Sequence, residues 1–305
     1  MLPSMTTAIF AKFVLNGIIA GSLYAILALG LSLLYGVLRF VNLAHGEIAI
    51  VGAYAFYSFY GILGWPLFPS FIAGIICLLA IVFLLEKFTF LPVRDSPPFI
   101  ALIISIGVGI FLQNTLLLVF EPFARSLRAE NTSYPLFSEI VRITDVQAIT
   151  IFASLGLMIA LWLFLQKTRL GKAIRAVADH KETASILGIP IQRIITLTFL
   201  ISAFLAGTAG ILAAFDQNLH PNLGSFFTIK SFAAVILGGI GSIPGAIAGG
   251  YFIGLAENIL IAIPFAGTYI PSSYKDAVAF AALVLFLYFK PTGFFGARRE
   301  EAVRK

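Results

Sequence analysis

The amino-acid sequence predicts an all-α, polytopic membrane helix bundle. Of its 305 residues, 60% are hydrophobic and only 11% are charged, whereas an average soluble domain has about 25% charged residues. A soluble fold has to cover its surface with polar groups, and this chain has too few of them. The apolar residues are also gathered into long runs, and a membrane-spanning helix needs about 20 such residues in succession.

Nine apolar runs follow one another along the chain, separated by short polar or Gly- and Pro-rich breaks. They cover residues 8–36, 41–61, 67–86, 98–120, 146–166, 194–215, 231–243, 245–263 and 276–289. The seventh run is short for a full crossing, and Gly238, Gly239, Gly241 and Pro244 crowd its end. A broken helix inside a membrane is tolerated where protein or a cavity surrounds it. We therefore predict a single transmembrane domain over residues 1–305 with eight or nine spans. A broken or half-crossing helix near 231–245 is the alternative to a ninth crossing.

The Lys and Arg residues indicate how the spans are oriented, because cytoplasmic loops retain an excess of positive charge. If all nine runs cross, most of the 20 Lys and Arg residues fall on the side of the polar segment 167–193, which alone carries six. This segment and the C-terminus are then cytoplasmic, and the N-terminus is outside. Topology also accounts for the net charge of +6. No basic face with interleaved aromatic residues indicates a nucleic-acid partner.

Residue patterns for catalysis, nucleotide binding or metal binding are missing from the sequence. Cys77 is the only cysteine and has no partner for a disulfide or a metal site. Gly171-Lys172 is the nearest approach to a phosphate-binding loop, but it lacks the earlier Gly and the following Ser or Thr. The few His and carboxylate residues are scattered. We predict no catalytic residues, no metal site and no cofactor in this chain.

The polar segment 167–193 has the pattern of a short amphipathic helix. An apolar stripe at helical spacing is formed by Ala173, Ile174, Val177, Ala178, Ala184 and Leu187. The remaining face carries the charged residues Lys172, Arg175, Asp179, Lys181 and Glu182. The apolar side needs a partner, and three are open: another loop of the chain, the lipid headgroups, or a separate cytoplasmic subunit.

A few polar side chains fall within or beside the apolar runs, where they either line a pathway or bond neighbouring helices. The candidates for the pathway are Asn16, Asn42, His45, Glu47, Glu257 and Asn258. His45 and Glu47, two residues apart, have the types that hold a metal or relay protons, but no other residue completes a metal set, so a structural role is favoured. Asn42 is a candidate helix cap. For Glu257 and Asn258, pathway lining and interhelical bonding are equally open.

Several segments, in order along nearly the whole chain, resemble the branched-chain amino-acid permease family of ATP-binding-cassette importers. The stretch Asn42–Tyr54 resembles the signature that follows the first span in this family, and similar matches lie at 171–188, 199–210 and 232–250. The resemblance implies a permease subunit in the cell inner membrane that forms the pathway for branched-chain amino acids or a related small polar solute. The rival interpretation is a self-sufficient secondary transporter or channel.

The same resemblance implies partners and a docking element. The pattern Glu182-x-Ala184-x-x-x-Gly188 resembles the opening of the loop through which such permeases engage their ATPases. The docking residues would then be Arg175, Asp179, Glu182, Ala184 and Gly188, with Gly188 ending the helix because Pro190 follows it closely. The implied partners are a second related permease subunit, two cytoplasmic ATPase subunits, an extracytoplasmic solute-binding protein and membrane lipid.

Overall fold

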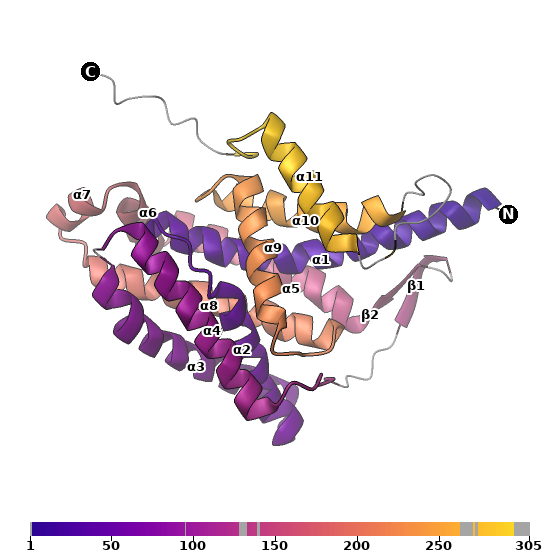
Figure 1. The fold of residues 1–305 in the computed structure, drawn as a ribbon, viewed down its shortest axis with the longest axis horizontal. Coiled ribbons are helices and arrows are strands. Elements are labelled where there is room, and N and C mark those ends of the chain that lie inside the picture. The colour runs from indigo at the N-terminus through magenta and orange to yellow at the C-terminus, as the bar shows by residue number, and fades with distance from the viewer. Residues whose placement is uncertain are drawn as a thin grey trace.

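The computed structural model describes residues 2–94, 96–127, 133–138, 141–262, 271 and 274–295. Within these ranges the protein is a bundle of α-helices with one small β-hairpin (Figure 1). The elements are α1 Leu2–Leu38, α2 His45–Tyr57, α3 Leu67–Leu85, α4 Pro98–Phe120, β1 Ser133–Ser138, β2 Val141–Thr144, α5 Asp145–Lys167, α6 Arg169–Asp179, α7 Lys181–Ile186, α8 Ile191–Asp216, α9 Leu223–Gly238, α10 Ile243–Ala262 and α11 Lys275–Phe289. A π-helical turn, Ser58–Ile62, extends α2.

Six of the described helices are long and apolar enough to cross a membrane. They run over Ile9–Leu38, Leu67–Val93, Pro98–Phe120, Asp145–Lys167, Ile191–Asp216 and Ile243–Ile261. Three further apolar helices are shorter, with 13 residues in α2, 16 in α9 and 15 in α11. The predicted helix bundle is therefore confirmed, and the two-stranded antiparallel hairpin is an addition that the hydropathy pattern did not indicate.

The predicted span at 231–243 is wrong in its boundaries. The helix begins eight residues earlier, at Leu223, and ends at Gly238. It ends there because Gly239 and Gly241 have φ angles of 97° and 84°, which favour glycine and cannot continue a helix. The last carbonyl groups of α9 accept hydrogen bonds from the backbone N–H groups of Phe294 and Phe295. A non-helical turn thus lies within the predicted region 231–245, but it separates two helices, α9 and α10, and the half-crossing stays a prediction.

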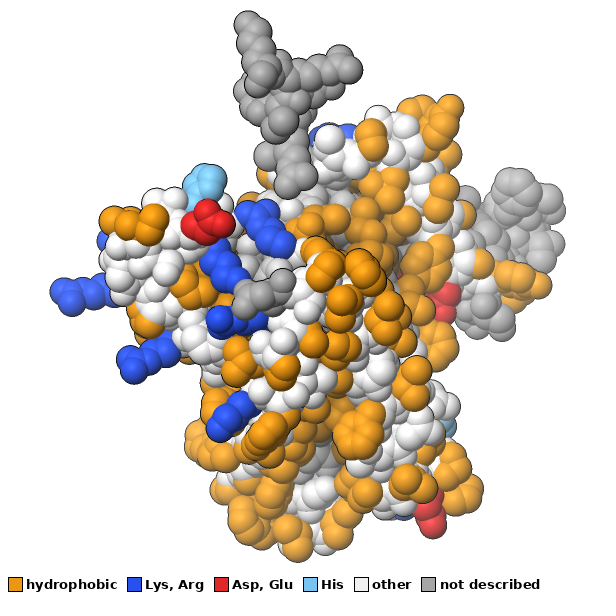
Figure 2. Space-filling model, turned by 60° about the vertical axis from the view of Figure 1, so that its left-hand side comes forward, with side chains coloured by type: hydrophobic (Ala, Val, Ile, Leu, Met, Phe, Trp, Pro, Cys, Tyr) orange, Lys and Arg blue, Asp and Glu red, His pale blue; other side chains and the backbone are white. Residues whose placement is uncertain are grey.

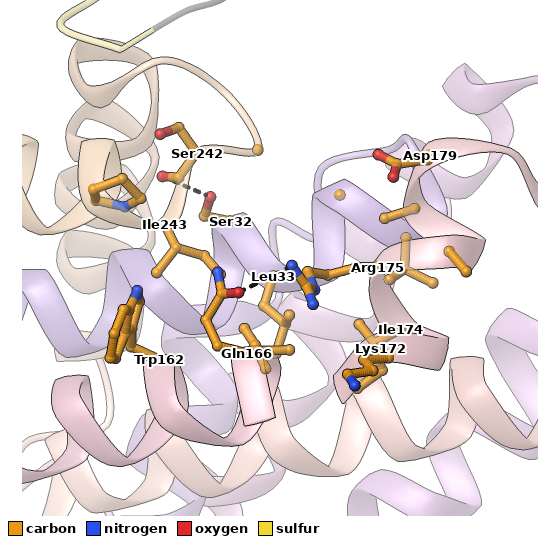
Figure 3. Close-up of a pocket in the computed structure, with 17 residues that line it drawn as sticks. Ser32, Leu33, Trp162, Gln166, Lys172, Ile174, Arg175, Asp179, Ser242 and Ile243 are labelled. Carbon is orange, nitrogen blue, oxygen red and sulfur yellow. Dashed lines mark hydrogen bonds between the residues drawn. The ribbon is translucent and has the colours of Figure 1, made fainter. Parts of the chain in front are cut away.

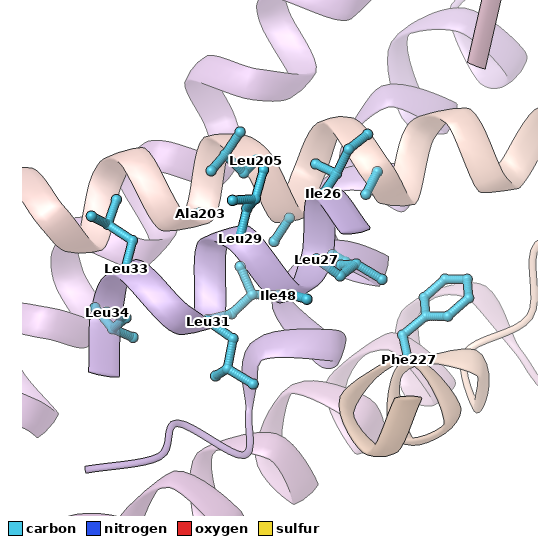
Figure 4. Packing of buried hydrophobic residues seen from close by; sticks show 14 of the residues in the cluster. Ile26, Leu27, Leu29, Leu31, Leu33, Leu34, Ile48, Ala203, Leu205 and Phe227 are labelled. Carbon is cyan, nitrogen blue, oxygen red and sulfur yellow. The ribbon is translucent and has the colours of Figure 1, made fainter. Parts of the chain in front are cut away.

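Helix α1 lies at the centre of the bundle. In its most apolar window 89% of the residues are buried, against 22% in α4. Figure 4 shows Leu27, Leu29 and Leu31 of α1 surrounded by α2, α8 and α9. A helix that is apolar all round is surrounded by protein or by lipid. Helix α1 is surrounded by protein, whereas the outer helices expose large apolar side chains such as Phe99, Ile103 and Leu118. These outer faces fit lipid, and they cover much of the surface in Figure 2.

Glycines let α1 and α10 approach closely in antiparallel orientation. Gly17 faces Gly254 and Leu255, and Gly21 faces Gly250 and Tyr251. A Cβ atom added at Gly254 would collide with the backbone of Gly21. Small residues have this role in membrane bundles because burial from lipid gives little driving force between helices, so dispersion contacts at short range must supply it.

Two of the short helices begin part of the way across the bundle. Residues 39–44 leave the end of α1 without helical structure and return to its middle, where an imidazole nitrogen of His45 lies 3.0 Å from the carbonyl oxygen of Leu27. Residues 217–222 precede α9 in a similar way. The two helices meet near their N-terminal ends: the Thr228 hydroxyl accepts from the N–H of Gly46 at 3.0 Å and donates to the carbonyl oxygen of Leu43 at 3.2 Å.

The α1–α10 contact gives a direct test of the fold. We expect Gly254→Val to lower the thermal stability of the purified protein, because overpacking costs about 1–3 kcal/mol and occasionally more. Gly156→Val in α5 is the matched control, since no atom lies within 4 Å of a Cβ at that position. Thermal shifts measured by size-exclusion chromatography after heating would separate the two. Equal stability of both variants would contradict the close contact.

Candidate functional site

A cavity of about 420 Å³ opens at the end of α5 and α8 that lies away from α6. We call it the polar pocket. Its lining comes from six helices and consists of Asn16, Ile19, Ala20, Leu23, Tyr24, Gln147, Asp216, Gln217, Lys230, Asn258 and Lys275. Amide and charged side chains dominate this lining, which is unusual for a site bounded by apolar helices. Polar groups inside a membrane protein commonly mark a solute pathway.

A buried ion network closes one side of the polar pocket. The Lys230 ammonium lies 2.9 Å from each of three oxygens, one each on Tyr24, Glu257 and Asp276. The Tyr24 hydroxyl in turn donates to the second carboxylate oxygen of Glu257 at 3.1 Å. Glu257 is only 1% exposed, so its charge needs this compensation. The network joins α1, α9, α10 and α11 at one level of the bundle.

Glu257 and Asn258, for which two roles were open, differ in their contacts. Glu257 bonds neighbouring helices, which is one of the two roles open from the sequence, and it also borders the pocket through Lys230. Asn258 lines the pocket and donates to the carbonyl oxygen of Gly254 at 2.8 Å. Asn16 lines the same pocket from α1. Lys230 was not among the predicted residues, because it lies between the apolar runs 194–215 and 231–243; its position directly before the second run was the available signal.

The other three predicted pathway residues lie elsewhere, at the junction of α2 and α9. Asn42 caps no helix: its side-chain oxygen accepts from the N–H of Ala44 at 3.0 Å, in a turn before α2. His45 lies against the Leu27 carbonyl, and its other nitrogen is 3.5 Å from the Ser202 hydroxyl. Glu47 accepts from Ser225 at 3.0 Å. All three predicted residues are buried, and none lines the polar pocket.

These contacts hold the non-helical segment 39–44 in place inside the bundle. Backbone groups there have no helical partners, and a buried unpaired group is costly. The Asn42 side chain pairs with the N–H of Ala44 and the Thr228 hydroxyl with the carbonyl oxygen of Leu43. His45 fixes the start of α2 to α1, and Ser225 fixes Glu47 to α9. The described residues include no group of three or more His, Cys, Asp or Glu side chains placed to hold a metal ion. The geometry therefore favours the structural role for His45 and Glu47.

Helices α6 and α7 form a compact element at the opposite end of the bundle. The buried side chains Ile174, Val177 and Ala184 pack against the chain itself, with α1, α5 and α8 beside them. Thr168 caps α6 by accepting from the N–H of Gly171 at 2.9 Å. The apolar stripe therefore packs against other parts of this chain, which was one of the three alternatives beside lipid headgroups and a separate subunit. Leu187 does not belong to the buried stripe.

The outward side of this element carries charge and two unusually exposed apolar side chains. Ile186 and Leu187 at the tip of α7 are 86% and 74% exposed. The predicted docking residues Arg175, Asp179, Glu182 and Gly188 are exposed as well, whereas Ala184 is buried. Figure 2 shows Lys and Arg side chains gathered around this end of the molecule. Exposed apolar residues rimmed by charge are typical of a protein-binding surface.

Gly188 ends α7, as the sequence predicts. Its φ angle is 80°, and its N–H donates to the carbonyl oxygen of Ser185 at 3.0 Å. The N–H of Ile189 donates to the carbonyl oxygen of Ala184 at 3.1 Å. These two bonds form the Schellman motif, in which a residue in the left-handed conformation satisfies the last carbonyl groups of a helix.

A second cavity, of about 630 Å³, lies beside α6 (Figure 3). We call it the loop pocket. Its walls are the ends of α1 and α5, the exposed face of α6 and the turn between α9 and α10. Arg175 donates to Gln166 at 3.1 Å on one side of it, and Ser32 donates to the carbonyl oxygen of Ser242 at 3.4 Å on the other. The glycine-rich turn thus faces the α6–α7 element across an open space.

Comparison with known proteins identifies relatives over nearly the full length. The profile of the family described as "Branched-chain amino acid transport system / permease component" matches residues 13–287. The chain is 36% identical to the high-affinity branched-chain amino acid transport system permease protein LivH of Escherichia coli K12, over 96% of this chain and 98% of that protein. It is 35% identical to BraD of Pseudomonas aeruginosa, with the same coverage of both chains.

A solved structure shows a similar fold. One chain of PsaBC from Streptococcus pneumoniae in complex with Fab has a TM-score of 0.51 and 17% identity, and the likeness covers 92% of both chains. At this level of identity the likeness concerns the arrangement of helices alone.

The Lys230 network can be tested by a double-mutant cycle. We expect Lys230→Met to destabilise the protein strongly, because removing one partner of a buried ion pair costs about 3–5 kcal/mol. Adding Glu257→Leu should restore part of the loss, since it removes the uncompensated carboxylate. Lys12→Met, at an exposed position of α1, is the control. The measurement is thermal unfolding of the parent, the two single network variants, the double variant and the control. Additive effects of the two network substitutions would contradict the pairing.

Proposed function

The chain belongs to the branched-chain amino acid permease family, and on that premise we propose that it is the membrane subunit of an ATP-driven importer for these amino acids or a related small polar solute. The observation that carries the proposal is the similarity to LivH along 96% of the chain. The long apolar helices and the central α1 are what a multi-pass protein of the cell inner membrane requires.

The energy for transport has to come from other polypeptides. This sequence lacks a phosphate-binding loop, so ATP hydrolysis is assigned to two cytoplasmic ATPase subunits. A second related permease subunit would complete the pathway, and an extracytoplasmic binding protein would deliver the solute. The polar pocket, with Asn16, Asn258 and the Lys230 network, is our candidate for the part of the pathway within this subunit.

We propose nine crossings, with the α6–α7 element in the cytoplasm. Counted together with the short helices α2 and α9, the six long helices and α11 give nine successive crossings along the chain. Each of these short helices would cross together with the non-helical segment before it. An irregular backbone at membrane depth is tolerated where it is buried in protein or lines a water-filled cavity. Phe40, Asn42 and Ala44 are buried in protein, and Gln217 lines the polar pocket. The six Lys and Arg residues of segment 167–193 support the cytoplasmic assignment.

The α6–α7 element is our candidate for the ATPase-docking surface. Packing of Ile174, Val177 and Ala184 fixes the element to α1, α5 and α8, so that a force on it reaches the membrane helices. Ile186 and Leu187 remain free to enter a groove on the ATPase, and the exposed charges of Arg175, Asp179 and Glu182 surround them. This division into a buried face and an exposed tip is what a force-transmitting contact needs.

The importer assignment is tested by reconstitution into proteoliposomes. The complete set of two permeases, two ATPases and binding protein should accumulate leucine when ATP is present. This subunit alone should give no concentrative uptake, because it has no energy source of its own. Accumulation by the isolated subunit in an imposed proton or sodium gradient would instead identify a secondary transporter.

The docking role is tested at Gly188. We expect Gly188→Val to reduce co-purification of the ATPase and substrate-stimulated ATP hydrolysis, because a β-branched residue disfavours the left-handed conformation that aims the tip of α7. Gly36→Val at the end of α1 is the matched control: neither position has an atom within 4 Å of an added Cβ, and only Gly188 has a positive φ angle. Parental levels of both readouts in Gly188→Val, at equal membrane abundance, would exclude the docking role.

A further inference from the structure

Among the described residues, the polar pocket has one positive side chain without a hydrogen bond or ion pair, Lys275, and one negative side chain with a single hydrogen bond, Asp216. We propose that it binds the charged head of a free α-amino acid, with the ammonium of Lys275 facing the α-carboxylate and the carboxylate of Asp216 facing the α-ammonium group. This assignment rests on the proposed transport function and narrows its substrate class to zwitterions.

Lys230 is not the residue that receives the carboxylate. An ammonium group has three donors, and Tyr24, Glu257 and Asp276 occupy the surroundings of Lys230 at 2.9 Å each. Lys275 lines the same cavity on α11, next to Asp276. In the part of the chain that the structure describes, Lys275 forms no hydrogen bond or ion pair. It is therefore the cation that a ligand finds available.

Asp216 offers the complementary charge. It is exposed at the last position of α8 and accepts one hydrogen bond, from the Gln147 side chain at 3.2 Å. Gln147 is itself fixed, because it belongs to the capping box that begins α5. The C-terminal end of a helix carries partial negative charge, which favours a bound cation. The carboxylate and the end of α8 thus attract an ammonium group together.

The rest of the lining is suited to the amino and carboxylate groups that all amino acids share, and it does not select one particular amino-acid side chain. Asn16, Gln147, Gln217 and Asn258 add amide donors and acceptors, whereas the apolar contribution is limited to Ile19, Ala20 and Leu23 on α1. The volume of about 420 Å³ lies within the range of roughly 300–1,000 Å³ for small-molecule sites. Urea or a neutral amide would leave both charged groups unpaired, and sites built for polar groups discriminate strongly against such ligands.

Protection of an introduced cysteine tests the site directly. Gln217→Cys, in a Cys77→Ala background, lies exposed at the pocket. In right-side-out vesicles that contain the permease and ATPase subunits but no binding protein, an impermeant thiol reagent added outside should label it. Millimolar leucine should slow this labelling several-fold. Isoamylamine lacks the carboxylate and 4-methylvalerate lacks the ammonium group, so neither compound should slow the labelling.

Two charge variants and one control complete the experiment. Lys275→Gln and Asp216→Asn should each abolish protection by leucine, whereas labelling of Ser133→Cys on the exposed hairpin should be indifferent to leucine in every background. Equal protection by isoamylamine would identify a cation site, and unchanged protection in both variants would place the ligand elsewhere; either result overturns the proposal.

If the complete importer accumulates leucine but leucine never protects Gln217→Cys, the pocket assignment fails and the importer function stands. If it accumulates no amino acid, the importer function fails.

Discussion

The close antiparallel contact between α1 and α10 is the constraint on which the rest of the structure depends. Gly17, Gly21, Gly250 and Gly254 bring the two backbones together, and in this register the Tyr24 hydroxyl reaches the Glu257 carboxylate. A shift of one residue would turn these side chains away from each other, since neighbouring positions on a helix point about 100° apart. The network around Lys230 therefore exists only because small residues set the register first.

Buried polar residues in this protein have two separate uses. At the junction of α2 and α9, Asn42, His45 and Glu47 belong to a set of contacts that stabilises broken backbone inside the bundle. At the polar pocket, and within the described ranges of the chain, Lys275 has no hydrogen bond or ion pair and Asp216 accepts one hydrogen bond. Polar groups in a membrane are expensive, and the two sets differ in where they lie. Asn42, His45 and Glu47 are buried away from the polar pocket, whereas Lys275 and Asp216 line it.

The sequence is sufficient where hydropathy alone decides the structure. The run 98–120 coincides with α4, and 146–166 differs from α5 by one residue at each end, because lipid contact makes such helices uniformly apolar. The sequence is insufficient to predict the helix over residues 223–230, whose Gly, Ser, Thr and Lys residues are typical of a loop. They are helical because Gly46 and Glu47 bond their hydroxyls and the Tyr24–Glu257 pair accepts Lys230. Such contacts between distant segments leave no local pattern. The charged pocket was missed for the same reason, since six helices contribute to it.

Helix α9 is one of several helices that connect the polar pocket with the cytoplasmic side proposed for α6 and α7; α1, α5 and α10 line both pockets as well. Lys230 lies at the pocket, and eight residues later Gly238 ends the helix, a distance of about 12 Å at the usual rise per residue. The turn that follows forms one wall of the loop pocket, and α6 forms another. The positive φ angles of Gly239 and Gly241 make this turn a defined bend, so a displacement of α6 that closed the loop pocket would press on the end of a short, stiff helix. Lys230, in the other half of α9, belongs to the ion network. Rigid elements whose ends contact both sites are what mechanical coupling requires. Helix α9 meets this condition through Lys230 and the turn that follows Gly238, and α1 meets it by lining both pockets with its own residues.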